Sequence, residues 1–259
     1  EVDLIEEVAR THGYDAFPAE LGASRPGTVP DDRLFQLQDG LRAALAGRGL
    51  LEAHTPAFAP PGEGDVEVSN PVTATEPFMR RDLLPSLLRR VAYNLAHGNR
   101  DVRLFEIGTS FRKADAGAAP HETTRISVAM TGRREPPHWS REDEALEIWD
   151  VKAVMEDLAE RVYGDGASVR PSSGEVFGAL EPGATLVIVD ASETVIGWGG
   201  RVADDMVDAP AWASDVWALE LSLPDEVNAV SATTSQPLPQ YPAAERDLAL
   251  LVPDHVLSQ

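Results

Sequence analysis

Three carboxylates near the amino terminus have the residue type and spacing that a divalent cation needs. Asp3, Glu6 and Glu7 are separated by three and four residues, so a helix would project all three side chains from one turn. Carboxylate oxygens are the ligands that hard cations prefer. Acidic residues also occur in first helical turns without a metal, because they complement the helix dipole. The spacing alone leaves both interpretations open.

Other patterns that could carry chemistry do not have the required partners. The glycine-rich run 197–201 has neither a P-loop lysine nor a following helix, so we expect a strand–turn–strand whose glycines allow close packing. Ser86 is not part of a G-x-S-x-G motif, and we expect it to face solvent or to cap a helix. Zinc-ligand spacing is absent among the six histidines, which are His12, His54, His97, His121, His138 and His255.

A pair of arginines, Arg80 and Arg81, precedes an apolar helical segment. Guanidinium groups in this position can bind a phosphate, a carboxylate or the acidic residues of a partner. In a chain this acidic, an internal salt bridge is the simpler role, and we favour it.

These residues would be positioned by four helices. Apolar residues recur three and four positions apart in residues 3–11, 32–47, 83–97 and 149–162, which predicts helices with one buried face. Asp31 or Asp32 can cap the second helix. In the third helix Pro85 is tolerated because it falls in the first turn.

Alternating apolar residues between glycine, proline and acidic turns predict many strands and few long helices. This is an α+β pattern with a mostly antiparallel sheet. Proline-rich stretches at 18–31 and 231–240 read as linkers. The expected strands are 52–58, 66–70, 102–107, 110–113, 125–131, 184–190, 194–202, 215–223 and 246–254.

Composition excludes several classes of function. The chain has 259 residues, of which 43% are hydrophobic, and contains no cysteine; it can therefore form a globular core but neither a disulfide framework nor a thiolate metal site. A net charge of -21, from 22 basic and 43 acidic residues, argues against a broad phosphate-tracking surface. No run of about 20 apolar residues predicts a membrane span. We expect a cytoplasmic protein, and a piece cut from a longer chain.

Five strings resemble, in the same order, the β subunit of bacterial phenylalanyl-tRNA synthetase. The first resembles the end of its small helical domain, the next three its core, and the last the start of its anticodon-binding domain. They are DLIEEVARTHGYDAFP, NPVTATEPFMRRDLLPSLL, DVRLFEIGTSF, IWDVKAVMEDL and YPAAERDLALLV.

The resemblance implies a class II aminoacyl-tRNA synthetase-like antiparallel sheet flanked by helices. It also implies a domain order: residues 1–20 end a small helical domain, 21–31 form a linker, 32–230 form a catalytic-like but inactive core, and 231–259 begin a ferredoxin-like domain. No residue is expected to be catalytic or to bind a nucleotide. The alternatives are an autonomous class II synthetase-like enzyme that uses ATP and an interaction module unrelated to translation.

Partners and cofactors follow from the same resemblance. It implies an α subunit that binds ATP and phenylalanine, an (αβ)₂ heterotetramer and tRNA(Phe) in the whole enzyme. It also implies a Mg²⁺ site to which Asp3, Glu6 and Glu7 contribute, with a further aspartate that would lie before Glu1 and is missing here. The helices 34–46 and 83–97 are expected to contact the α subunit.

Overall fold

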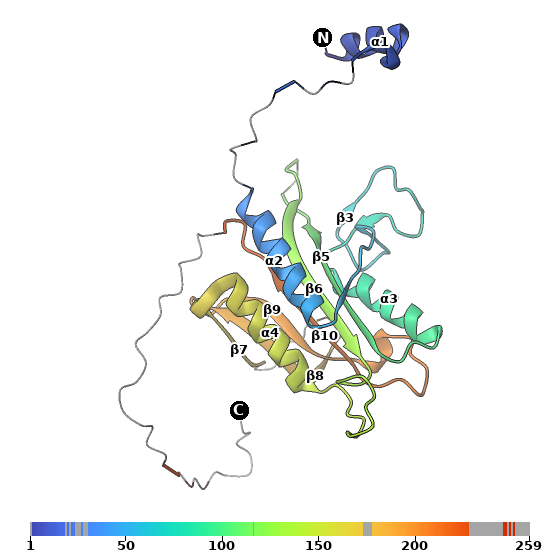
Figure 1. Ribbon diagram of the computed structural model, residues 1–259. Helices are drawn as coiled ribbons and strands as arrows, with labels where there is room; N and C mark the ends of the chain where they lie inside the picture. Colours follow the sequence, from blue (N-terminus) through green and yellow to red (C-terminus); the bar gives the residue numbers. More distant parts are fainter. Residues whose placement is uncertain are drawn as a thin grey trace. The chain divides into compact units, whose positions relative to one another are not determined.

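A computed structural model of the chain (Figure 1) describes most of it. Residue contacts divide the chain into two units, Glu1–Val227 and Asn228–Gln259. Every described helix and strand lies in the first unit, while the strand expected at 246–254 falls mainly outside the described part. The described residues are 2–18, 20, 22, 23, 27, 31–115, 117–172, 178–227, 246, 247, 249 and 251.

A seven-stranded sheet forms the centre of the first unit. Its strand order is β1-β5-β6-β10-β9-β8-β7. β1 runs parallel to β5, and the other neighbours pair antiparallel. The expected α+β class with a mostly antiparallel sheet is therefore confirmed. The strands are β1 (Leu51–Glu52), β5 (Val102–Arg112), β6 (His121–Thr131), β7 (Ala167–Pro171), β8 (Leu180–Asp190), β9 (Val195–Val202) and β10 (Val216–Ser222).

Helices cover both faces of this sheet (Figure 1). On one face, α2 (Arg33–Gly47) and α4 (Ile148–Tyr163) pack against side chains such as Phe105, Val128 and Leu219. On the other face, α3 (Leu84–Ala96) packs against Ala129 and Ala218. The two faces alternate along each strand, as the two-residue period of a strand requires.

Capping residues mark where the predicted helices begin. The side chain of Asp32 accepts hydrogen bonds from the backbone N–H groups of Leu34 and Phe35, at 2.9 and 3.1 Å, and thereby satisfies two of the free donors at the start of α2. The Asp150 carboxylate accepts a 2.7 Å bond from the backbone N–H of Glu147 at the start of α4. Pro85 falls in the first turn of α3, as expected.

Several strand predictions were wrong in detail. Residues 52–58 form no continuous strand, because Pro56 has no N–H to pair; only β1 and β2 (Phe58–Ala59) lie at their ends. β2 belongs to a small sheet of order β2-β4-β3, with β3 at Val66–Glu67 and β4 at Phe78–Met79.

Other predicted turns lie inside strands. The strands expected at 102–107 and 110–113 are one strand, β5, which continues through Gly108. The run 197–201 lies inside β9 and makes no turn. Its glycines do allow close packing, since a Cβ at Gly200 would lie 2.1 Å from the carbonyl oxygen of Ala184. β7 was not predicted, because its five residues ASVRP show no run of apolar alternation.

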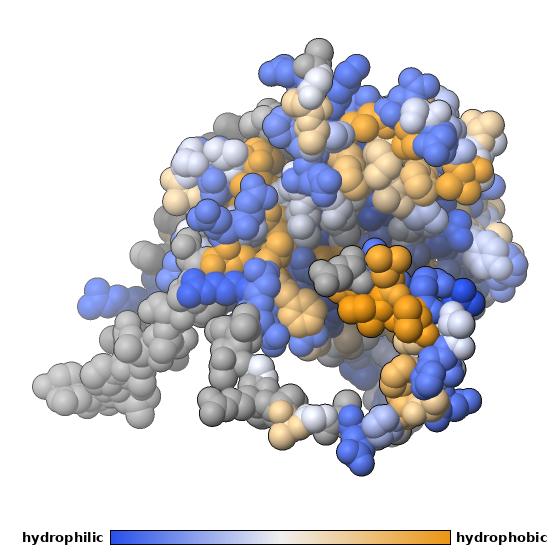
Figure 2. Space-filling view, turned by 90° about the horizontal axis from the view of Figure 1, so that it is seen from above, coloured by the Kyte–Doolittle hydropathy of each residue, from blue (hydrophilic) through white to orange (hydrophobic). Residues whose placement is uncertain are grey.

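The amino-terminal helix α1 (Val2–His12) has no buried residue, and its apolar side chains, among them Leu4 and Val8, are exposed. Three short 3₁₀ helices complete the described elements, at Tyr14–Ala16, Gly164–Gly166 and Asp204–Met206. Hydrophobic and hydrophilic residues are interspersed on the face that Figure 2 shows. Within the described residues, no helix is long and apolar enough to cross a bilayer.

Candidate functional site: a buried polar row beside α3

Three polar residues form a row across the centre of the sheet, on the face that α3 covers. Ser127 of β6 pairs with Glu106 of β5 on one side and with Glu220 of β10 on the other. All three residues are at most 2% exposed. Two carboxylates buried in this way are costly unless each has a countercharge and hydrogen-bond donors.

Arg80 supplies the countercharge for Glu106. Its Nη1 lies 2.7 Å from Glu106 Oε1, and both side chains are almost fully buried. The same Nη1 donates to Thr55 Oγ1 at 2.8 Å, and Nε donates to the carbonyl oxygen of Thr109 at 3.0 Å. Thr55 Oγ1 in turn donates to Glu106 Oε2 at 2.6 Å. The pair therefore ties the loop after β1 and the loop before α3 to strand β5.

The glycine at position 108 is required by this pair. A Cβ built on Gly108 would lie 2.4 Å from Arg80 Nη2 and 3.3 Å from Glu106 Oε1. Any side chain here would displace the buried guanidinium, because an approach of this kind is closer than van der Waals contact allows.

Glu220 is held by the start of α3 and by a second arginine. Its Oε2 accepts hydrogen bonds from the backbone N–H groups of Leu83 and Leu84 at 3.0 and 2.9 Å. Its Oε1 accepts from Arg125 Nη1 at 3.0 Å. A carboxylate at a helix amino terminus is stabilised by the free N–H groups and by the helix dipole. Glu220 therefore fills the anion-binding position of α3 from within the protein.

Burial has a larger effect on the pKa of Glu220 than the arginine and the N–H groups that stabilise its charged form. Removal from water raises the pKa of Glu220 to about 7, and the nearby Asp82 acts in the same direction. Arg125 and the Leu84 N–H oppose this rise in the pKa. Glu220 is therefore a buried carboxyl group that titrates close to neutral pH.

Asp82 lies between the buried Arg125–Glu220 pair and two surface arginines, and together with the Arg80–Glu106 pair these residues form one charged cluster. Its Oδ1 lies 3.4 Å from Arg125 Nη1 and 3.4 Å from Arg112 Nη2, and its Oδ2 lies 3.4 Å from Arg81 Nε. Among the described residues, Arg125 Nε is the one buried side-chain nitrogen or oxygen without a hydrogen-bond partner. The four arginines of the cluster thus share three carboxylates, those of Glu106, Asp82 and Glu220.

Apolar side chains fill the rest of the contact between α3 and the sheet. Leu84, Leu87 and Val91 are at most 1% exposed and belong to one cluster with Ala129 and Ala218. Charged groups on this face are satisfied by one another, and the apolar groups are packed together. This arrangement is suited to holding elements together, because its buried donors and acceptors, apart from Arg125 Nε, already have internal partners.

The residues singled out in the sequence have different outcomes. An internal salt bridge was expected at the arginine pair, and Arg80 makes a buried one; Arg81 pairs with its neighbour Asp82 at the surface. The expectation for Ser86 was wrong: it is 5% exposed, and its Oγ accepts a 2.9 Å hydrogen bond from Arg89 Nη2. It is buried because the helix turns this position toward the sheet.

The three predicted metal ligands lie on α1. Glu7 makes an exposed ion pair with Arg10, with 2.6 Å between Oε2 and Nη2. Over the described part of the chain, no three His, Cys, Asp or Glu side chains are grouped so that they could hold a metal ion. Asp3, Glu6 and Glu7 therefore do not make a complete ligand set by themselves, and their role stays a prediction.

Sequence reasoning missed Glu106, Arg125 and Glu220. A signal was present, because each acidic residue interrupts an apolar strand, in LFEIG and WALELSL. Charged residues within buried strands are rare unless they are paired, so these positions could have been selected. Their partners could not, since Glu220 and Leu83 are 137 residues apart.

Comparison with solved structures identifies the class of fold. The chain resembles pyrrolysyl-tRNA synthetase from Desulfitobacterium hafniense with a TM-score of 0.54 and 16% identity, over 73% of this chain and 66% of that one. A second structure of a pyrrolysyl-tRNA synthetase from this organism gives a TM-score of 0.50 and 18% identity. The domain therefore has the fold of a tRNA synthetase.

Sequence comparison identifies the family. Residues 18–223 match the family model described as phenylalanyl tRNA synthetase beta chain CLM domain, and the chain belongs to this family. Phenylalanine–tRNA ligase β subunits are 36% identical in Xanthomonas euvesicatoria over 267 residues and 31% identical in Syntrophus aciditrophicus over 275 residues. Each alignment covers 99% of this chain and 33% of the relative. The chain thus spans about a third of the length of these relatives.

Proposed function

We propose that the chain is the non-catalytic core of a phenylalanine–tRNA ligase β subunit. It supports an α subunit that attaches phenylalanine to tRNA(Phe) in an ATP-dependent reaction. The observation that carries this proposal is the internally paired polar row, in which Glu106 and Glu220 are each bound by an arginine and by backbone or hydroxyl donors. Family membership supports the same conclusion, because the relatives are named as β subunits.

The proposed domain order is the one implied by the resemblance. Residues 1–20 end a helical domain, 21–31 are a linker, 32–230 are a class II synthetase-like core, and 231–259 begin an anticodon-binding domain. The whole enzyme would be a cytoplasmic (αβ)₂ heterotetramer. The class II assignment is supported by the antiparallel sheet and by the likeness to another tRNA synthetase.

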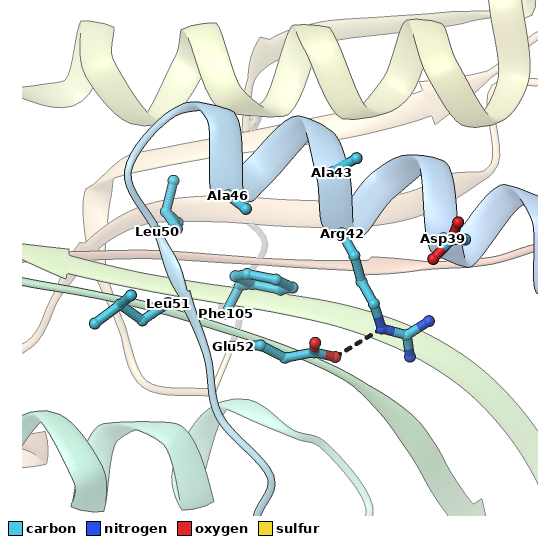
Figure 3. A pocket seen from close by; sticks show the side chains of 8 residues that line it. All are labelled: Asp39, Arg42, Ala43, Ala46, Leu50, Leu51, Glu52 and Phe105. Carbon is cyan, nitrogen blue, oxygen red and sulfur yellow. Dashed lines mark hydrogen bonds and ion pairs between the residues drawn. The ribbon is translucent and has the colours of Figure 1, made fainter.

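The α subunit would contact α2 and the neighbouring sheet edge. A hollow of about 390 Å³ lies between them (Figure 3), and an ion pair with 2.8 Å between Arg42 Nε and Glu52 Oε1 crosses its rim. Leu51 is 69% exposed at the edge strand, and Phe35 is exposed on α2. Exposed apolar groups around a hollow fit a protein partner. The hollow is lined by Asp39, Arg42, Ala43, Ala46, Leu50, Leu51, Glu52 and Phe105.

Mg²⁺ in the whole enzyme would be bound with the help of Asp3, Glu6 and Glu7. A fourth carboxylate from outside this chain would complete the ligand set, because three carboxylates on one exposed helix leave most coordination positions to water. In the whole β chain, replacing Glu6 by Gln should weaken Mg²⁺ binding measured by titration calorimetry. Unchanged Mg²⁺ affinity would contradict this assignment.

Binding to the α subunit tests the proposed function. The α subunit from the same species should co-purify with this chain, and the chain alone should bind neither ATP nor phenylalanine. Leu51→Asp should weaken the complex, because it replaces an exposed apolar side chain at the hollow with a charged one. Val72→Asp is the matched control, since Val72 is 84% exposed and does not line the hollow. ATP binding by the chain alone would refute the proposal and favour an autonomous enzyme.

A further inference from the structure

The hydrogen bonds around Glu220 match its ionised form. Oε2 accepts from the backbone N–H groups of Leu83 and Leu84 at 3.0 and 2.9 Å, and Oε1 accepts from Arg125 Nη1 at 3.0 Å. An ionised carboxylate only accepts hydrogen bonds, whereas a neutral carboxyl group must direct its O–H toward an acceptor. Uptake of a proton by Glu220 therefore requires at least one of these donors to move away.

Arg125 is the donor that can move. The N–H groups of Leu83 and Leu84 belong to the start of α3 and have a fixed direction, and without Glu220 they would be buried and unpaired, which is costly. Arg125 has a second acceptor, because the same Nη1 lies 3.4 Å from Asp82 Oδ1. Within the described ranges its Nε is buried without a hydrogen-bond partner. The arginine can therefore exchange one carboxylate for the other.

Asp82 can accept more strongly than it does in this structure. Its ion-pair contacts with Arg125, Arg112 and Arg81 all measure 3.4 Å. A strong charge-assisted hydrogen bond of this kind is shorter, at about 2.7 to 2.9 Å. Asp82 is therefore an acceptor that Arg125 can approach more closely.

Ser127 can accept the hydrogen of a neutral Glu220. The two residues are paired across β6 and β10, so their side chains project from the same face of the sheet. Ser127 Oγ donates its own hydrogen to the carbonyl oxygen of Leu219 at 3.1 Å, which leaves its lone pairs to accept. Both ionisation states of Glu220 therefore have hydrogen-bond partners in the fold.

Few of the charges around Glu220 can respond to its ionisation. β9 contributes Trp198 opposite Glu220, which does not ionise. Arg80 and Arg89 are each held by a carboxylate of their own. The surrounding charged groups are Arg125 from β6, Arg112 and the Arg80-paired Glu106 from β5, Arg81 and Asp82 from the turn before α3, and Arg89 from α3.

We propose that Glu220, Arg125 and Asp82 form a proton-operated switch at the start of α3. With Glu220 ionised, Arg125 pairs with Glu220. When Glu220 Oε1 takes up a proton from solvent, Arg125 keeps its own proton and moves to Asp82. The N–H groups of α3 stay on Oε2, so the helix remains in place while Asp82 loosens its surface pairs. The switch is independent of the proposed function.

Infrared difference spectra and crystal structures of the full chain at about pH 6 and about pH 8 test this switch. The acid spectrum should contain the band of a buried neutral carboxyl group, with a midpoint near pH 7. Glu220→Gln should lack this band, and Glu181→Gln, a control at a side chain that is 40% exposed, should retain it. In the acid crystal structure Arg125 Nη1 should lie within about 3.0 Å of Asp82 Oδ1.

Asp82→Asn tests the second position of Arg125. The Asp82 charge raises the pKa of Glu220, so its removal should lower the midpoint of the band by about half a pH unit or more. An Arg125 side chain that stays on Glu220 in the acid structure would overturn the switch. The same conclusion would follow from absence of the band at about pH 6, from its survival in Glu220→Gln, or from an unchanged midpoint in Asp82→Asn.

Discussion

Replacing Arg80 by methionine should destabilise the protein far more than the same change at its neighbour Arg81. In Arg80→Met, Glu106 would stay buried without its countercharge. The carbonyl oxygen of Thr109 would lose the hydrogen bond that Arg80 Nε donates to it. Breaking a buried ion pair from one side costs about 3 to 5 kcal/mol. For a domain of this size, each kcal/mol lowers the melting temperature by about 2 to 4 °C, so a decrease of about 10 °C is expected.

Arg81→Met provides the comparison, because Arg81 is 40% exposed and its ion pair with Asp82 is a surface pair. Such pairs contribute about 0 to 1 kcal/mol. Urea unfolding compares the two variants, and adding Glu106→Gln and Arg80→Met/Glu106→Gln gives the coupling energy between Arg80 and Glu106. The double variant should recover part of the loss. Equal destabilisation by Arg80→Met and Arg81→Met would show that the buried pair does not hold these elements together.

Three further predictions concern packing, ionisation and capping. Gly200→Ala should destabilise the protein by about 1 to 3 kcal/mol, since the new Cβ would meet the carbonyl oxygen of Ala184. Gly40→Ala in α2 places its Cβ in open space and should stabilise the protein by up to about 1 kcal/mol. The urea midpoints of the two variants test this difference. Because the pKa of Glu220 is raised from 4.5 to about 7, its contribution to stability is full below pH 4.5 and lost by pH 7, a change of up to about 3 kcal/mol. Glu220→Gln should remove this pH dependence, and a wild-type slope in the variant between pH 5 and 7 would disprove the assignment. Asp32→Ala should lower the free energy of unfolding by about 1 kcal/mol, because α2 loses its cap. A lower thermal midpoint is expected, and an unchanged midpoint would contradict this role of Asp32.

Helices were more predictable than strands in this chain. The helices at 33–47, 84–96 and 148–163 have long apolar periods and clear starts, so the sequence located them to within about two residues. The short strands near Pro56 and the edge strand β7 have too few residues for a period to be recognised. Gly108 was expected to end a strand, but its function is to make room for the Arg80 guanidinium.

The candidate site was predictable in kind but not in its partners. Arg80 was expected to form an internal salt bridge, and a charged residue within an apolar strand is a recognisable signal of a buried pair. Which carboxylate receives which arginine depends on strand order, and the sequence does not specify that β10 lies between β6 and β9. The row formed by Glu106, Ser127 and Glu220 therefore follows from the sheet topology, not from any local pattern.

The central position of β10 has a consequence for how the chain folds during synthesis. β10 is the last strand of the sheet to leave the ribosome, yet it lies between β6 and β9. Until residues 216–222 emerge, the edges of β6 and β9 are both unpaired, and open strand edges favour aggregation. Long-range pairing of this kind also slows folding. The nascent domain therefore stays incomplete until nearly all of its sheet has been translated, and a chain that stalls before β10 exposes two unpaired strand edges.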